Sequence, residues 1–350
     1  MDMMGIVARR AALTSLVTLA ACGTKGPESA GPTSQDGSAS VGSMRAGGDD
    51  SPDAKAFGGE DGDGGATPGP SSTGSATVGP DGSTPPGATD ASTGLAQDAA
   101  APSPGWKRGL AYGYDSDADM TALSKGIGWW YNWSPSPDGT LSKGFTSGVE
   151  FVPMIWGGTF DTTTLATQVP AGAKYLLTFN EPNFGSQSNL TPSQAAALWP
   201  QIQAFASARG MKIVSPAVNY CGSPCNDTDP FDWLSKFFAA CTGCQVDYVA
   251  MHWYACTKSA LTSTVAKYEQ QFGKPLWVTE FSCLDTSSDV TDAFELSYMK
   301  DAVAALEADP MVFRYSWFTG RSTGSPPISV LGADGGVLTP LGQQYVTLPR

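Results

Sequence analysis

Two short segments stand out in this 350-residue chain: Thr178-Phe179-Asn180-Glu181-Pro182-Asn183 and Trp277-Val278-Thr279-Glu280-Phe281. Each is a run of apolar, β-branched or aromatic residues that reaches a glutamate. Glutamate is depleted in β-strands and is seldom buried unless it is paired. The two segments therefore predict two strands whose ends bring two carboxyl groups to one place. The alternative interpretation is two surface glutamates that merely follow two core strands.

Around these segments, strand-like and helix-like stretches alternate along the chain. The strands are expected at residues 107–113, 127–132, 150–156, 175–180, 212–218, 247–253, 276–281 and 312–318. The clearest helices are expected at residues 191–209, 229–240, 261–272 and 289–308. The spacers after the second and third strands are short, so any helix there should be a single turn or absent. This alternation predicts an α/β fold, a parallel (β/α)8 TIM barrel.

Residues 106–350 have the composition of a single folded domain. They contain all ten Trp, all eleven Tyr and the only His of the chain. Their length fits the roughly 250 residues of a TIM barrel. Their 15 basic and 21 acidic residues give a net charge of −6 without a basic cluster, which argues against nucleic acid as a partner.

The predicted strand ends carry an unusual set of side chains. The first two strands run into Tyr112 and Trp129-Trp130-Tyr131-Asn132-Trp133, and the third ends at Trp156. Later strands end at Asn219 and at His252-Trp253-Tyr254. Active-site residues of such barrels sit at the carboxyl ends of the strands. Flat aromatic faces stack on sugar rings while Asn, His and Tyr bond hydroxyls, so this rim predicts a carbohydrate site.

The two glutamates are the candidate catalytic residues. The fourth and seventh strands lie nearly opposite each other in an eight-stranded barrel, so Glu181 and Glu280 are expected to face a shared ligand. Two carboxyl groups on either side of a sugar–sugar bond are the groups that hydrolyse it, and a separation of about 5–5.5 Å corresponds to retention of configuration. We assign Glu181 as the general acid/base and Glu280 as the nucleophile.

The remaining candidates are predicted to bind substrate. Asn180 is expected to bond the sugar 2-hydroxyl, although it could instead be a strand-end turn amide. His252 and Tyr254 should share one face of their strand, where either could orient a carboxylate, with Trp253 on the other face. Trp317 is the expected floor for the sugar at the cleaved bond. Trp130, Trp133 and Trp156 are candidate stacking surfaces for further sugars, although each could equally pack in the core. Asn132 and Asn219 are further expected substrate contacts.

The N-terminal part of the chain predicts export. Residues 1–22 contain Arg9 and Arg10, then an apolar run from Ala11 to Ala21 that is too short to span a bilayer. The run ends at Cys22 in a sequence that resembles a lipoprotein signal, so Cys22 is the expected lipidation site; an ordinary secretory signal is the alternative. The chain is therefore expected to be a bacterial lipoprotein at the cell surface or outer membrane, or a secreted protein.

Residues 23–105 are expected to be a disordered linker. They are rich in Gly, Ser, Pro, Thr, Ala and Asp, and their 11 acidic and 3 basic residues give a net charge of −8. Such a segment has too little apolar surface to offset the chain entropy that folding would remove. A flexible tether between a membrane anchor and a folded domain is the expected role.

Six cysteines follow the candidate lipidation site, and an even number suits an oxidising compartment. We favour two local bridges, Cys221–Cys225 and Cys241–Cys244, and a third between neighbouring strand ends, Cys256–Cys283. Spacing alone allows 15 pairings among six cysteines. A zinc site is the alternative, but a single His in an exported chain makes it unattractive.

The motifs quoted above resemble those of a known family. Thr178 to Asn183, Tyr248-Val249-Ala250-Met251-His252-Trp253-Tyr254, Trp277 to Phe281 and Gly128-Trp129-Trp130-Tyr131-Asn132-Trp133 resemble glycoside hydrolase family 128, the alkali-sensitive-linkage-type catalytic domain. The resemblance covers about residues 106–346. It implies a retaining (β/α)8 glycosidase with endo-β-1,3-glucanase activity, and it carries the acid/base role to Glu181 and the nucleophile role to Glu280.

The expected protein is thus a monomeric β-glucan hydrolase that needs no metal or organic cofactor and is held to a membrane through Cys22. One alternative is a retaining hydrolase of another β-linked polysaccharide, such as mannan or mixed-linkage glucan. The other is a glucan-capture lipoprotein without turnover, although a binding protein would need neither Glu181 nor Glu280.

Overall fold

The computed structural model describes residues 107–113, 115–137, 139–221, 225–284, 290–323 and 327–350. The predicted signal segment, the lipidation site and the linker therefore lie outside the described residues. Within the described part, every helix is too short or too polar to cross a bilayer.

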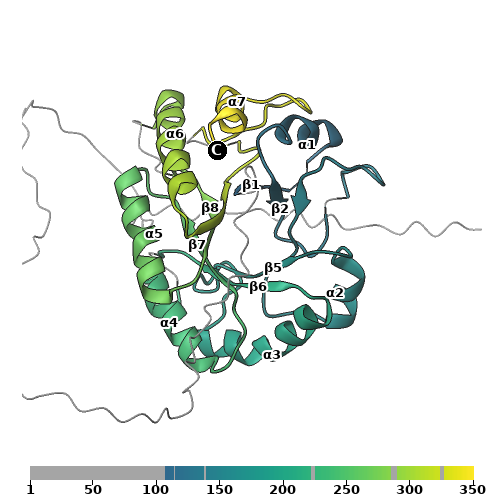
Figure 1. The fold of residues 1–350 in the computed structure, drawn as a ribbon, viewed down its shortest axis with the longest axis vertical. Coiled ribbons are helices and arrows are strands. Elements are labelled where there is room, and N and C mark those ends of the chain that lie inside the picture. The colour runs from purple at the N-terminus through teal and green to yellow at the C-terminus, as the bar shows by residue number, and fades with distance from the viewer. Residues whose placement is uncertain (1–106, 114, 138, 222–224, 285–289, 324–326) are drawn as a thin grey trace, which may run out of the picture. The chain divides into compact units, whose positions relative to one another are not determined.

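All the named strands pair in parallel in one sheet (Figure 1). They are β1 (Arg108–Ala111), β2 (Trp129–Tyr131), β3 (Glu150–Phe151), β4 (Met154–Ile155), β5 (Tyr175–Asn180), β6 (Lys212–Val218), β7 (Tyr248–Trp253), β8 (Leu276–Phe281) and β9 (Val312–Trp317). Each strand expected from the sequence is present, with ends that agree to about two residues.

The sheet closes into a barrel through the segment that contains β3 and β4. Its order is β3-β2-β1-β9-β8-β7-β6-β5-β4, so β3 and β4 stand at the two ends. These two strands are halves of one extended segment, separated by Val152 and Pro153. The Val152 amide donates to Trp130 on one side, and the Pro153 carbonyl accepts from Leu177 on the other. One continuous segment therefore joins both edges and makes the predicted (β/α)8-type barrel.

Helices cover the outside of the barrel (Figure 1). They are α1 (Asp117–Leu123), α2 (Thr162–Gln168), α3 (Pro192–Ala208), α4 (Pro230–Ala240), α5 (Lys258–Phe272), α6 (Asp292–Ala308) and α7 (Pro340–Thr347). The four expected helices correspond to α3–α6. The short helices α1 and α7 were not predicted from the sequence. After the third strand a single turn or no helix was expected, whereas α2 has seven residues. The described residues between β2 and β3 contain no helix, as the short spacer predicts.

Local sequence signals fix the ends of the long helices. Thr191 caps α3 by accepting from the Gln194 amide, and the Gln194 side chain accepts from the Thr191 amide in return. Pro192 occupies the first turn, where its missing N–H costs no helical hydrogen bond. Gly273 ends α5 with a φ of 60°, a left-handed conformation that glycine adopts without a steric penalty. These ends set the length of each helix against the sheet.

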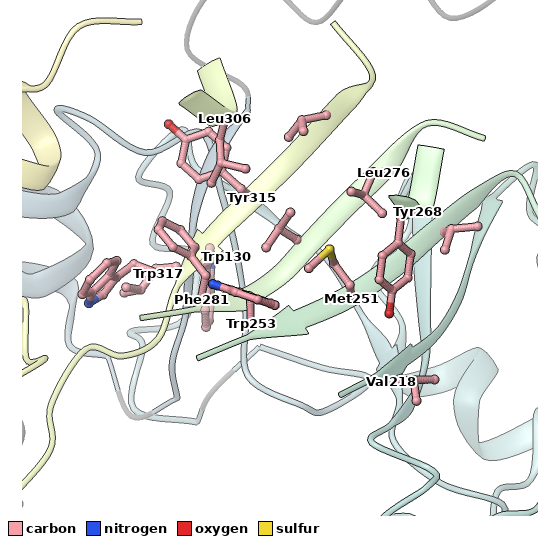
Figure 2. Close-up of a cluster of buried hydrophobic side chains, with 14 of the residues drawn as sticks. Trp130, Val218, Met251, Trp253, Tyr268, Leu276, Phe281, Leu306, Tyr315 and Trp317 are labelled. Carbon is pink, nitrogen blue, oxygen red and sulfur yellow. The ribbon is translucent and has the colours of Figure 1, made fainter. Parts of the chain in front are cut away.

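Strand alternation divides the buried side chains into two layers. One layer fills the barrel and includes Trp129, Tyr131 and Trp277. The other lies between the sheet and the helices, where Figure 2 shows Trp130, Trp253, Phe281 and Trp317 together. Neighbouring residues of one strand thus enter different layers, as a two-residue side-chain period requires.

A buried arginine fills the barrel interior below the carboxyl ends of the strands. The Arg314 guanidinium carbon lies 4.6 Å from the Tyr175 ring centre and 4.9 Å from that of Trp277. Its Nη2 is 2.6 Å from a carboxylate oxygen of Glu150. Cation–π contacts and an ion pair together offset the cost of burying this charge. The barrel is therefore packed rather than open beneath its upper rim.

All three favoured disulfides are present: Cys221–Cys225, Cys241–Cys244 and Cys256–Cys283. The first two join cysteines that are 4 and 3 positions apart in the sequence. The third joins cysteines 27 positions apart, in the segments that follow β7 and β8. Because β7 and β8 are paired neighbours, the Cys256–Cys283 bridge ties together the two strand ends that carry His252 and Glu280.

Candidate active site

Glu181 follows directly on β5 and is placed by an irregular strand end. The pairing of β5 with β6 shifts register twice, between Leu176 and Thr178 and again between Thr178 and Asn180. Phe179 and Glu181 have positive φ values of 31° and 40°, which non-glycine residues rarely adopt. Such strain persists only where the surroundings impose it and is concentrated at functional sites. Here the Glu181 amide still donates to the Ala217 carbonyl at 2.9 Å, which anchors the turn.

Glu280 lies within β8, and its carboxylate is surrounded by donors. Its Oε1 accepts hydrogen bonds from the Tyr131 hydroxyl at 2.9 Å and the Trp133 indole N–H at 2.8 Å. Its Oε2 accepts from the Tyr254 hydroxyl. Because hydrogen bonds to an ionised acceptor favour the charged form, these donors hold Glu280 in one orientation and stabilise it as a carboxylate.

The pKa values around Glu280 reflect this burial. Burial raises the pKa of the Glu280 carboxyl, the charge on His252 lowers it and the charge on Glu181 raises it. Hydrogen bonds from Tyr254 and Trp133 lower it further, and the net direction is upward. Burial and the Glu280 charge raise the pKa values of Tyr131 and Tyr254 well above their ordinary range, so both phenols remain protonated donors.

Glu181 has different neighbours, all of which reach one of its oxygens. Its Oε1 lies 3.0 Å from His252 Nδ1 and accepts a hydrogen bond from Asn219 Nδ2 at 3.3 Å. No hydrogen bond among the described residues reaches its Oε2. One oxygen is therefore held by the protein while the other is available to a ligand.

His252 lies between the two glutamates. While Nδ1 faces Glu181, Nε2 lies 3.5 Å from Glu280 Oε1. Burial lowers the pKa of His252, whereas the charge on Glu280 and the hydrogen bond and charge of Glu181 raise it, and the net direction is upward. The imidazole thus lies between the two carboxyl groups: its Nδ1 is within hydrogen-bond distance of Glu181, whereas its Nε2 makes no hydrogen bond with the described residues.

The two carboxyl groups are close together and nearly buried. One ligand atom from each of Glu181, His252 and Glu280 lies within 4.8 Å of the others. Glu181 is 8% and Glu280 4% exposed. Hydroxyl, amide, indole and imidazole groups surround them, rather than hydrocarbon. The two carboxyl groups are therefore close enough to contact one ligand at the same time.

Glu181, His252 and Glu280 are close enough together to hold a metal ion. In the described part of the chain, they are the group of His, Cys, Asp or Glu side chains that meets this condition. Each oxygen of Glu280, however, already accepts at least one hydrogen bond, and Oε1 accepts two. The hydrogen bonds from two phenols and an indole N–H thus stabilise the Glu280 carboxylate through neutral donors.

Several predicted substrate-binding residues lie near this pair. The Asn180 amide group donates to Gln187 at 3.2 Å, and its buried carbonyl oxygen has no hydrogen-bond partner. Trp156 follows β4 and is 40% exposed, which suits a stacking surface. His252 and Tyr254 share a face, and Trp253 enters the opposite layer, as alternation predicts. Asn132 bonds instead to Ser134 and Ser136 of its own loop.

The prediction that Trp317 and Trp130 contact sugar was wrong. Trp317 is fully buried between the sheet and the helices, where its indole N–H donates to the Ile328 carbonyl at 2.8 Å. Trp130 is 2% exposed and packs on Phe151 in the same outer layer. Figure 2 shows both in that layer. The sequence gives the alternation of a strand but not which of its two faces points to the barrel axis.

Two hydrogen-bond partners of Glu280 were not predicted as such from the sequence: Tyr131 was not a candidate site residue, and Trp133 was expected to contact sugar instead. Tyr131 shares the inner face of β2 with Trp129, opposite Trp130. Trp133 follows the strand with a φ of 57°, which turns the chain at the rim. The sequence signal that could have identified these donors is the tyrosine or tryptophan at every second position from Trp129 to Trp133. Each of these side chains combines an apolar ring with a polar hydrogen-bond donor.

A surface hollow of about 410 Å³ lies elsewhere, between α3 and the Cys241–Cys244 loop. Its lining consists of Pro200, Gln203, Ala204, Ser207, Thr242, Gly243 and Cys244. None of these residues offers an acid, a base or a free nucleophile, because Cys244 is in a disulfide. This hollow therefore has no group suited to acid–base or nucleophilic chemistry.

A parallel barrel with two facing carboxyl groups at the carboxyl ends of opposed strands defines the chain as a glycoside hydrolase. Comparison with known proteins agrees. The family model described as "Glycosyl hydrolase catalytic core" matches residues 109–345.

Two similar solved structures belong to one family. A subgroup II endo-β-1,3-glucanase of glycoside hydrolase family 128 from Sorangium cellulosum is 47% identical, with a TM-score of 0.66 over 70% of this chain and 99% of that one. A subgroup I endo-β-1,3-glucanase from Amycolatopsis mediterranei, in complex with laminaritriose, is 32% identical, with a TM-score of 0.55 over 69% and 99%. The chain belongs to glycoside hydrolase family 128.

A curated relative is "Alkali-sensitive linkage protein 1" of Schizosaccharomyces pombe, 32% identical over 250 residues and 69% of this chain. The match spans 44% of the length of that relative.

The buried position of Trp317 predicts a structural role. Trp317→Ala should lower the free energy of unfolding by about 3–5 kcal/mol, because it leaves a cavity in the outer layer. Trp156→Ala, at an exposed position, should change it by at most about 0.5 kcal/mol. Thermal or urea unfolding of the two variants beside the parent measures both values. Equal stability of all three proteins would place Trp317 outside the core.

Proposed function

We propose that the protein is an endo-β-1,3-glucanase that acts by double displacement, with Glu181 as general acid/base and Glu280 as nucleophile. The observation that carries this proposal is the close approach of the two carboxyl groups, with one oxygen of each within 4.8 Å. A water molecule placed for direct inversion requires about 6.5–9.5 Å between carboxyl groups, whereas a covalent glycosyl-enzyme requires the shorter separation.

The surroundings of the two glutamates support the division of roles. Glu280 is held on both oxygens by donors that favour its ionised form, which is the form that attacks the anomeric carbon. Glu181 is held on Oε1 only. Its Oε2 is available to give a proton to the departing oxygen and later to take one from water.

The proposed substrate follows from the family relatives. The similar structures named above are described as endo-β-1,3-glucanases, and one of them contains laminaritriose. In this chain, the unpartnered Asn180 oxygen is placed to accept a hydrogen bond from a sugar hydroxyl, and the exposed Trp156 ring to stack on a sugar face. Another β-linked glucan or mannan is the second candidate substrate, because such a pair of acids does not itself select a linkage.

Digestion of laminarin and curdlan by the full chain tests the proposal, with barley glucan and mannan as comparison substrates. We expect oligosaccharides of several lengths from the β-1,3-glucans, whereas glucose alone would indicate attack from a chain end. Glu181→Gln and Glu280→Gln should each lower turnover by at least about 10³ without loss of folding, since each removes a reacting group. Full activity in either variant would contradict the assigned roles.

Azide distinguishes the two roles. In Glu280→Ala, azide should restore turnover by attacking in place of the missing carboxylate and should give an α-glycosyl azide. In Glu181→Ala, azide should intercept the glycosyl-enzyme and give the β-anomer. Recovery of the opposite anomers would exchange the two assignments, and NMR of the purified azides identifies them.

The raised pKa of Glu280 predicts the acid limb of the pH profile. Glu280 must be ionised to attack, so kcat/KM should rise with pH as its carboxyl group loses its proton. Tyr254→Phe removes a hydrogen bond that lowers this pKa, so its acid limb should move to higher pH. Tyr220→Phe is a matched control, because Tyr220 is 47% exposed and its nearest aromatic neighbour is Phe231 rather than Glu280. An unmoved limb in Tyr254→Phe would contradict this effect.

We further propose an exported monomer, made of a signal segment (1–22), a flexible linker (23–105) and a catalytic domain (106–350), and held to a membrane through acylated Cys22. The three disulfides support an oxidising compartment. Metabolic labelling with a radioactive fatty acid in a bacterial host should mark the parent chain and spare Cys22→Ser. Equal labelling of both proteins would place the acyl group at another residue, and labelling of neither would leave secretion without an anchor.

A further inference from the structure

Asn219 holds one oxygen of Glu181, and its own amide group is oriented by the backbone. Its Oδ1 accepts a hydrogen bond from the Tyr220 amide at 2.8 Å, while its Nδ2 donates to Glu181 Oε1 at 3.3 Å. A reversed amide group would turn its oxygen toward the carboxyl group and its NH2 group toward the Tyr220 N–H, so both contacts would be lost. The backbone therefore makes the Asn219 side chain present a donor to Glu181.

Two loops meet beside this contact. The first, the acid/base loop, consists of residues 182–190 and follows Glu181 directly. The second, the bridged loop, follows β6, the strand that pairs with β5. Its described residues are 219–221 and 225–228, and the Cys221–Cys225 disulfide joins these two parts. The loop that supplies the donor is thus the loop that the disulfide closes.

Asn183 joins the two loops from the acid/base side. Its Nδ2 donates to the Asn219 carbonyl at 2.7 Å and to the Asp227 carbonyl at 3.1 Å. Because the Asn183 residue is fully buried, bulk water is not available to replace these acceptors. A single amide group of the acid/base loop therefore holds both described parts of the bridged loop.

Asn226 joins the two loops in the opposite direction. Its Nδ2 donates to the Pro182 carbonyl at 2.9 Å and to the Leu190 carbonyl at 3.1 Å, and its backbone amide donates to the Asn183 carbonyl at 2.9 Å. Pro182 and Leu190 are the first and last residues of the acid/base loop. Asn183 and Asn226, here called the amide clamp, thus hold each loop against the other.

The Cys221–Cys225 disulfide lies where it limits the movement of the bridged loop. Cys221 is two positions after Asn219, and Cys225 directly precedes Asn226. Cys225 also pairs with Phe184 of the acid/base loop as an isolated antiparallel bridge. A cross-link removes conformational freedom from the segment that it closes. The disulfide therefore reduces the entropy that the bridged loop must lose to keep its hydrogen bonds.

We propose that the disulfide and the amide clamp position Asn219, and that Asn219 positions Glu181 for proton transfer. This role rests on the proposed function of Glu181 as acid/base. Asn219 and His252 both contact Glu181 Oε1, so the place of Oε2 relative to the departing oxygen depends on them. Asn219 and the amide clamp act through Glu181 and are therefore positioning residues.

The nucleophile has a separate set of supports. Glu280 accepts hydrogen bonds from donors that lie outside both loops: Tyr131, Trp133 and Tyr254. A different disulfide joins the segments that follow β7 and β8. Loss of the amide clamp should therefore impair proton transfer and spare the attack of Glu280 on the anomeric carbon.

The two steps of the double displacement depend differently on Glu181. In the first, a Glu280 oxygen bonds to the anomeric carbon, the bond to the departing oxygen breaks, and that oxygen takes the Glu181 proton. A 2,4-dinitrophenolate departs without this proton because it is stable as an anion, whereas a phenolate needs it. In the second step, Glu181 takes a proton from water, the water oxygen bonds to the same carbon, and the ester bond to Glu280 breaks. A displaced Glu181 should slow this second step for every substrate.

Asn219→Ala in the full chain tests the contact with Glu181. With phenyl β-laminaribioside, kcat/KM should fall by roughly 10- to 100-fold, the effect of losing a hydrogen bond to a charged group. With 2,4-dinitrophenyl β-laminaribioside, kcat/KM should change little, while kcat should fall and azide should restore it. Equal losses of kcat/KM with the two leaving groups would show general damage to the site and would overturn the proposal.

The disulfide has a matched control in the same chain. Cys221→Ser/Cys225→Ser should lower the activity on the phenyl glycoside relative to the dinitrophenyl glycoside, in the same direction as Asn219→Ala. Cys241→Ser/Cys244→Ser removes a bridge of similar span at the end of α4, and it should keep the parental ratio of the two activities. An unchanged ratio in both double variants would contradict the role of the Cys221–Cys225 bridge.

Hydrogen exchange followed by mass spectrometry tests the amide clamp without reference to activity. The amides of Glu181, Phe184 and Leu190 donate at 2.9, 3.0 and 2.8 Å to the carbonyls of Ala217, Glu181 and Pro182. In Asn226→Ala, peptides that cover residues 181–190 should exchange faster than in the parent. Asn226 is exposed, so its replacement should leave the barrel folded.

The control double variant should exchange at the parental rate over the same peptides. Parental exchange in Asn226→Ala as well would overturn the proposal, because the amide clamp would then not hold the acid/base loop. If the parent cleaved neither aryl glycoside, the proposed function would fail, while hydrogen exchange would still decide whether the amide clamp holds Glu181 in place.

Discussion

The burial of the Glu280 carboxylate constrains the whole upper rim of the barrel. A buried anion is stable only when donors surround it, and those donors come from separate strands. Tyr131 and Trp133 belong to β2 and the turn after it, while Tyr254 follows β7. Two segments far apart in the chain must therefore keep a common register with β8. The same geometry that stabilises the charge prepares it to attack, so stability and chemistry depend on one set of contacts.

Closure of the sheet makes this register possible. An open sheet would leave β2 and β5 at distant edges, but the split third strand joins them, with β3 on β2 and β4 on β5. Pro153 lies at the split and contributes a carbonyl acceptor to Leu177 while lacking a donor of its own. The irregular end of β5 then turns Glu181 toward the axis. The positive-φ residues Phe179 and Glu181 thus lie at the rim, where backbone strain can be part of a functional site.

The barrel buries charged or titratable side chains both in its interior and at its rim, and their surroundings differ. Arg314, deep in the interior, is balanced by Glu150 and by the faces of Tyr175 and Trp277, so its charge is permanent and structural. At the rim, His252 lies between two acids, Glu181 and Glu280. Burial lowers the pKa of His252, whereas the charges on Glu280 and Glu181 raise it. Unlike a guanidinium, which is always protonated, an imidazole can change its charge near neutral pH.

The sequence by itself determined the eight strands, the four long helices and the placement of Glu181 and Glu280 at strand ends. The reason is that the spacing of apolar residues and the residues that begin or end a helix or strand are local properties of the chain. It also separated His252 and Tyr254 from Trp253, since alternation needs no tertiary information. Only the tertiary structure decided that Trp317 and Trp130 face the helices and that Tyr131 and Trp133 reach Glu280. The physical reason is that alternation divides a strand into two faces, while the closure of the barrel decides which face meets the axis and which distant residues meet there.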